Sequence, residues 1–94
     1  MNAQEWQEMI HGLPCVVCWL QTGQRRYNVE AHHLESVRDE LSIWLEVPLC
    51  KDHHGPGSGI GIHDLHRRGF YTRYRLDDLS LMAATLKLLN ERRP

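Results

Sequence analysis

The chain has 94 residues and a formal net charge of −1, with 41% hydrophobic and 24% charged residues. This balance is that of an ordinary globular protein, and the length predicts a single domain over residues 1–94. No apolar run approaches the ~18 residues of a membrane-spanning helix, and the first residues lack the basic-then-apolar pattern of a signal peptide. We therefore expect a cytoplasmic protein with no membrane contact. Its core is of a size that often needs support from metal or from oligomerisation.

The first third of the chain is expected to carry a short helix and a cysteine-bearing turn. Apolar side chains recur at helical spacing over residues 2–10, and a glycine and a proline end this predicted helix. Residues 15–18, Cys-Val-Val-Cys, are then most simply a turn or knuckle. A polar connection over residues 21–26 leads into the first predicted strand.

The middle of the chain has the pattern of a hairpin followed by a glycine-rich loop. Residues 27–34 and 43–49 are predicted strands, and the charged residues 36–42 form the loop between them. Four glycines and a proline over residues 55–61 indicate a tight loop, and residues 62–70 follow as a short predicted helix. These elements favour an α+β fold.

The end of the chain gives the clearest helical signal. After a connector over residues 71–75, leucines and alanines recur at helical spacing over about residues 77–92. Asp77 or Asp78 can cap this helix. Its leucine stripe is expected to be part of the core or a surface for homodimerisation.

Cysteines and histidines are the most informative part of the composition. The chain has three cysteines, and in a reducing cytosol such residues more often bind metal than form disulfides. It also has seven histidines, of which only His11 falls outside three clusters. The clusters are His32-His33, His53-His54 and His63-x-x-His66.

The cysteines fit the layout of a structural zinc site. Cys15-x-x-Cys18 and Cys50-x-x-His53 are two short pairs separated along the chain, and two such knuckles close a tetrahedron of thiolate and imidazole ligands. His54 can replace His53 as the fourth ligand, and the spacing leaves this choice open. The alternative is that the cysteines are simply small core residues.

The remaining histidines suggest a second, open site. Neighbouring residues on a strand point to opposite sides, so one of His32 and His33 can bind a metal while the other faces a substrate. Hydrolysis of a phosphodiester needs this division, because a metal stabilises the phosphate while a neutral histidine takes a proton from water. His54 and His63 can complete such a site. The alternative is that these histidines are buried or exposed without a catalytic role.

Three runs in this region resemble the HNH endonuclease superfamily. They are Ala31-His32-His33-Leu34, then Val47-Pro48-Leu49-Cys50-Lys51-Asp52-His53-His54, and finally Gly61-Ile62-His63. The chain most resembles the small phage and prophage HNH proteins with an upstream Cys-x-x-Cys, over roughly residues 13–70. The resemblance implies a ββα-metal (HNH, or His-Me finger) core with zinc knuckles and flanking helices.

The resemblance also implies a role for each residue. It implies that His33 is the general base and that His66 competes with His63 as a ligand, although a surface position on a short helix is the simpler reading of His66. The implied structural zinc ligands are Cys15, Cys18, Cys50 and His53, and the implied catalytic-metal ligands are His32, His54 and His63.

The sequence departs from the HNH pattern at two points. The signature has a middle Asn that steadies the loop between the strands, and no Asn occurs between Leu34 and Val47. Asp39 or Ser42 are the candidates to replace it. The glycine-rich loop also separates His54 from His63, so it must fold back for both to reach one metal, which glycines permit.

Four arginines follow the histidines and are candidates for binding DNA. The near-neutral net charge counts against a non-specific nucleic-acid binder, but bound cations would add positive charge. Tyrosines are interleaved with the arginines, and a solvated surface is the alternative reading. The candidate DNA-binding residues are Arg67, Arg68, Arg73 and Arg75.

The sequence therefore predicts a metal-dependent DNA endonuclease of HNH type, of phage or prophage origin. Its expected cofactors are a structural Zn²⁺ and a catalytic divalent metal, namely Mg²⁺, Mn²⁺, Ni²⁺ or Zn²⁺. One alternative is a zinc-stabilised module that binds nucleic acid or protein without catalysis. Another is a small structural or assembly protein that dimerises through its last helix.

Overall fold

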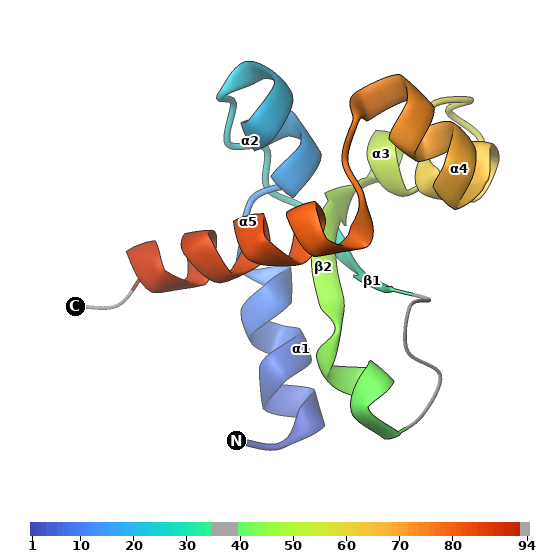
Figure 1. The fold of residues 1–94 in the computed structure, drawn as a ribbon. Helices are drawn as coiled ribbons and strands as arrows, with labels where there is room; N and C mark the ends of the chain where they lie inside the picture. The colour runs from blue at the N-terminus through green and yellow to red at the C-terminus, as the bar shows by residue number, and fades with distance from the viewer. Residues whose placement is uncertain (35–39, 93–94) are drawn as a thin grey trace.

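The computed structural model describes residues 1–34 and 40–92 and has the predicted α+β fold (Figure 1). A two-stranded sheet lies among helices, and the 3-10 helix η1 lies just before the second strand. No helix in the described residues is long and apolar enough to cross a membrane. The elements are α1 (Ala3–His11), α2 (Val16–Thr22), β1 (Val29–His33), η1 (Glu40–Trp44), β2 (Glu46–Cys50), α3 (Lys51–His54), α4 (Ile62–Tyr74) and α5 (Asp78–Glu91).

The hairpin of β1 and β2 sets the directions in which the side chains of β1 point. The strands pair antiparallel, with Val29 opposite Cys50 and His33 opposite Glu46. Because side chains alternate along a strand, Glu30 and His32 point to one face of the hairpin while His33 points to the other. The hairpin thus separates the two adjacent histidines.

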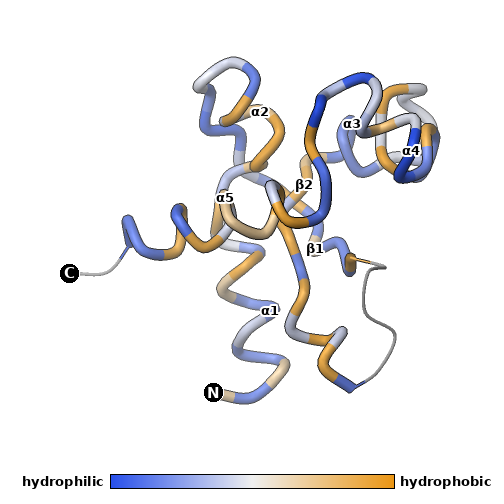
Figure 2. Tube along the Cα trace, in the orientation of Figure 1, coloured by the Kyte–Doolittle hydropathy of each residue, from blue (hydrophilic) through white to orange (hydrophobic). Residues whose placement is uncertain are grey.

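The core surrounds β2, all of whose residues are buried. Both α1 and α5 contact this strand, and α5 crosses it in Figure 1. Apolar segments of β2 and α5 meet at this crossing in Figure 2. The largest fully buried side chains include Ile10, Leu13, Val16, Val17, Val47, Leu49, Phe70, Leu81 and Leu88. The buried face of the last helix is therefore used within the chain.

Several predicted elements differ from the structure. Residues 16–22 form helix α2 instead of a turn, because their apolar side chains pack into the core and Gly23, with a φ of 77°, ends the helix in the left-handed conformation. The second strand begins at Glu46, since η1 takes up residues 40–44. The predicted connector over 71–75 is wrong: α4 continues to Tyr74, whose ring packs on Phe70 one turn earlier.

The cap of α5 gives a testable contribution to stability. Asp77 is the N-cap, and its Oδ1 accepts a hydrogen bond from the backbone N–H of Ser80 at 2.7 Å. We expect Asp77→Ala to lower the thermal unfolding midpoint by roughly 4–8 °C, because the helix loses one of its N-terminal acceptors. Asp77→Asn keeps an acceptor and should stay close to the wild type in the same melting experiment. Equal losses in both variants would contradict this role.

Candidate metal centre

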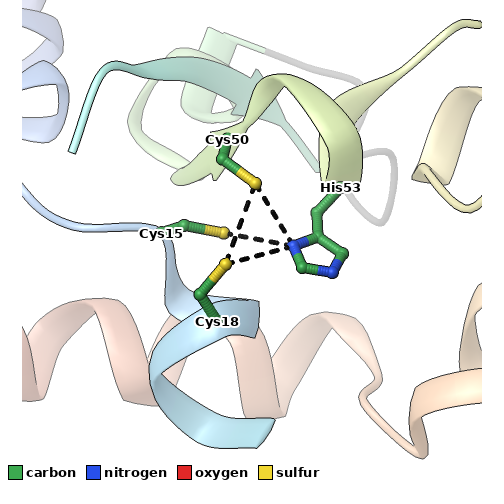
Figure 3. A group of neighbouring side chains, drawn as sticks. All are labelled: Cys15, Cys18, Cys50 and His53. Carbon is green, nitrogen blue, oxygen red and sulfur yellow. Dashed lines mark hydrogen bonds between the residues drawn. The ribbon is translucent and has the colours of Figure 1, made fainter. Parts of the chain in front are cut away.

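Three cysteines and one histidine gather between α2, β2 and α3 (Figure 3). Cys15 is the N-cap of α2 and Cys18 lies in its first turn, Cys50 ends β2, and His53 follows in α3. The Nδ1 of His53 lies 3.6 Å from the Sγ of Cys15, 3.5 Å from that of Cys18 and 3.3 Å from that of Cys50. The Sγ atoms of Cys18 and Cys50 are 3.9 Å apart. In this structure it is His53, and not His54, that joins the cysteines.

These spacings fit one tetrahedral zinc ion. Zinc bonds of about 2.3 Å to sulfur and about 2.0–2.1 Å to nitrogen place tetrahedral ligands ~3.6 Å apart for sulfur and nitrogen, and ~3.8 Å apart for two sulfurs. The four side chains can therefore hold a metal ion such as zinc with little movement. Cysteines from two elements and a histidine from a third would then be fixed to one another.

The electrostatics of this cluster also favour a cation. Burial raises the pKa of Cys18 to about 12, and repulsion from the neighbouring Cys15 and Cys50 adds to the shift. Burial likewise raises the pKa of Cys15, whereas it lowers the pKa of His53. A bound divalent cation would stabilise the thiolates that burial alone disfavours, and a neutral imidazole is the form that binds metal.

A second group consists of three imidazoles from three different elements: His32 from β1, His54 from α3 and His63 from α4. The Nε2 atoms of His54 and His63 are 3.1 Å apart, and one ligand atom of each histidine lies within 4.8 Å of the others. Burial, and then the neighbouring His54 and His63, lower the pKa of His32 to about 4. His32 is therefore neutral near pH 7, as a metal ligand must be.

The glycine-rich loop folds back because Asp64 organises it. The carboxylate of Asp64 accepts backbone N–H bonds from Gly57, Gly59 and Gly61 at 2.8, 3.2 and 3.0 Å. A Cβ at Gly61 would lie 2.5 Å from the backbone N of Gly55, so the two ends of the loop can meet only with glycine at this position. This closure brings His63 next to His54. The sequence analysis missed Asp64, whose only signal is an acidic residue in the first turn of a helix.

Glu30 lies behind the second group, on the far side of the His54 ring. The Nδ1 of His54 is 3.4 Å from the Oε1 of Glu30, and it is buried and has no hydrogen bond in the described part of the chain. A carboxylate in this position fixes the ring orientation of a metal-binding histidine whose other nitrogen faces the ion. With Glu30 near its Nδ1 and the Nε2 of His63 beside its Nε2, His54 is oriented as a metal-binding histidine would be.

His33 lies outside the second group and pairs with a buried carboxylate across the hairpin. Its Nε2 is 2.9 Å from the Oε1 of Glu46, and the side chain of His33 is 50% exposed while that of Glu46 is 4% exposed. Burial raises the pKa of Glu46, whose second oxygen has no hydrogen-bond partner among the described residues. Burying a carboxylate oxygen without a partner costs folding free energy, which marks Glu46 as a candidate functional residue.

The four arginines occupy different surroundings. Arg67 lines a hollow of about 60 Å³ together with His32, His63 and His66, and its guanidinium lies 3.3 Å from Asp78. Arg68 does not line this hollow, but it lines a larger neighbouring groove to which Arg67 also contributes. The remaining two stack on tyrosines: Arg73 lies 5.6 Å from the ring of Tyr74, and Arg75 lies 5.8 Å from that of Tyr71. Of the four predicted DNA-binding arginines, the structure brings Arg67 to the histidines.

Three further sequence candidates can also be located. His66 lines the same hollow, but among the described residues it does not belong to the three-histidine group of His32, His54 and His63. Ser42 lies in η1, where its backbone carbonyl accepts a bond from Leu45. Asp39 falls outside the described residues.

Comparison with known proteins gives one family. The model of the family described as "Recombination enhancement, RecA-dependent nuclease" matches residues 2–86, which include both Cys/His groups and most of α5. No match was found among curated proteins.

Proposed function

The chain belongs to the recombination-enhancement, RecA-dependent nuclease family, and from that premise we propose that it is a metal-dependent DNA endonuclease of HNH (ββα-metal) type. The observation that carries the proposal is the group of His32, His54 and His63, three imidazoles that converge next to an arginine. A three-histidine site leaves positions free for water and substrate, as catalytic metal sites require.

The two Cys/His groups receive different roles in this proposal. Cys15, Cys18, Cys50 and His53 hold a structural zinc, because four protein ligands close its coordination shell. His32, His54 and His63 hold the catalytic metal, which when bound would stabilise charge on the scissile phosphate and on the leaving oxygen. Glu30 supports His54 from behind.

Catalysis by the chain itself centres on His33. With the Nε2–H of His33 donated to Glu46, Nδ1 carries the lone pair and takes a proton from the attacking water. The resulting hydroxide attacks phosphorus, the bond to the leaving oxygen breaks, and that oxygen is protonated from solvent. Glu46 both fixes the tautomer and stabilises the imidazolium that forms, which explains its costly burial.

Arg67 is proposed to bind the DNA backbone beside the metal. Asp78 holds its guanidinium at the hollow next to His32 and His63, where a phosphate oxygen would meet it. Arg68, Arg73 and Arg75 are proposed to contact phosphates farther along the duplex, because all four arginines come from the same helix and its C-cap.

The test is DNA cleavage by the purified chain in a series of divalent metals, with and without RecA. We expect the wild type to cleave, and His54→Ala to lose at least roughly 100-fold in rate because the catalytic metal loses one of three ligands. His54→Ala should keep one zinc per chain and its folded state. The control is Asn90→Ala, at an exposed position of α5 away from both groups, which should cleave like the wild type.

The competing function is a zinc-stabilised binding module without catalysis, which the net charge of −1 favours. Metal analysis separates the two functions. A single tightly held zinc, no second metal, and no cleavage in any metal with RecA present would establish the binding module and contradict the endonuclease.

A further inference from the structure

We propose that His66 contacts the DNA, donating a hydrogen bond from its imidazole to a phosphate oxygen next to the scissile bond. This inference rests on the proposed nuclease function and adds a substrate contact to the same site. Three observations support it: the position of His66, its backbone conformation, and the size of the hollow that it lines.

The side chain of His66 lies where a backbone phosphate would approach the metal. It lines the hollow formed with the ligands His32 and His63 and with Arg67. It is exposed, and it is outside the metal-binding group of the described residues, so its ring nitrogens remain free for another partner. A free imidazole beside a guanidinium is suited to an anionic oxygen.

The backbone of His66 adopts a conformation that normally requires glycine. Its φ of 59° and ψ of 174° interrupt α4, which is otherwise helical from Ile62 to Tyr74. The structure on both sides holds this kink: the N–H of Leu65 bonds to the carbonyl of Gly61, and the hydroxyl of Tyr74 donates to the carbonyl of Ile60 at 3.0 Å.

A glycine at position 66 would therefore fit this kink without strain. A histidine is present there instead, at the edge of the proposed active site. Strained residues persist where the surrounding fold imposes them, and they cluster at functional sites. The position and the backbone strain together indicate that the imidazole of His66 has a binding role.

The hollow selects the part of the DNA that can enter. Its volume is about 60 Å³, against about 440 Å³ for the neighbouring groove that Arg68 lines, so a phosphate oxygen enters it more readily than a nucleobase. A non-bridging phosphate oxygen fits, and the guanidinium of Arg67 supplies the matching charge. The recognised group is therefore the sugar–phosphate backbone, which implies that this contact carries no sequence preference.

The test combines stability and DNA affinity in His66→Gly. Glycine removes the strain and the imidazole together, so we expect a thermal midpoint a few degrees above that of the wild type and a weaker complex with DNA. The affinity for a short DNA duplex, measured by fluorescence anisotropy with Ca²⁺ in place of a cleavage-supporting metal, should fall about 10-fold or more. A residue with a purely structural role would not move stability and affinity in opposite directions.

Two further variants sharpen this result. His66→Asn keeps a hydrogen-bond donor and a residue type that tolerates positive φ, so it should recover part of the lost affinity. Asn28→Gly changes another positive-φ residue, with a φ of 67°, outside both Cys/His groups, and should bind DNA like the wild type.

The inference and the proposed function can fail separately. If the wild type cleaves DNA and His66→Gly binds it with unchanged affinity, the contact by His66 is wrong while the nuclease function stands. If the folded, metal-loaded wild type neither binds nor cleaves DNA, both proposals are overturned.

Discussion

Replacing Cys50 with serine is expected to abolish zinc binding and with it the cooperative folded state. The cluster joins α2, β2 and α3, so the variant loses the link between these elements as well as a ligand. Structural zinc contributes about 10–16 kcal/mol of apparent binding free energy in small zinc-dependent peptides, whereas a whole domain is stable by only about 5–15 kcal/mol. Circular dichroism during heating and metal analysis of the purified chain measure both losses.

A conservative variant separates loss of zinc from loss of a side chain. His53→Cys converts the three-cysteine, one-histidine set into four cysteines, which is also a structural zinc environment. It should keep one zinc and most of the thermal stability. A Cys50→Ser chain that lacks zinc yet melts at the wild-type temperature would show that the cluster does not support the fold.

His33→Ala is expected to reduce DNA cleavage by roughly 10²–10⁴-fold, because the attacking water loses its proposed general base. The zinc content should not change, since His33 belongs to neither metal-binding group of the described residues. Stability should fall as well, because the buried carboxylate of Glu46 loses its partner at 2.9 Å. Cleavage rates in the optimal metal, together with thermal melting, measure these effects.

A double-mutant cycle tests whether Glu46 acts through His33. Glu46→Gln keeps the size of the side chain but removes its charge, so we expect a roughly 10-fold slower cleavage. In the His33→Ala background the same change should have little further effect, since residues that act as a unit are not additive. Independent effects of the two substitutions, multiplying in the double variant, would contradict the proposed pair.

Much of the candidate site could be predicted from spacing alone. Two cysteines three residues apart, followed later by Cys50 and His53, are the pattern of paired zinc ligands, and the alternation of a strand separates His32 from His33. Such local patterns depend on residues close in sequence. The local patterns of apolar residues, glycines and prolines also predicted the α+β class, which the structure confirms.

The rest depends on contacts between distant residues. Glu30 and Glu46 look like ordinary charged residues of a strand, and only the strand register and the position of α3 bring them to histidines. Asp64 matters because a loop closes onto it. The strained backbone of His66 has no sequence signal at all, since a histidine in a helical pattern gives no indication of its φ.

Helix α3 has a consequence for the order in which the protein binds its metals. Its single turn carries His53 to the cysteine cluster and His54, the next residue, to the three-histidine group. A zinc ion that fixes His53 must also restrict His54, so the free energies of loading the two metals are coupled. Linkage makes this coupling reciprocal, and each ion should tighten the binding of the other. The chain is therefore expected to fill its sites in order, with the buried cysteine group first and the three-histidine group preorganised by it.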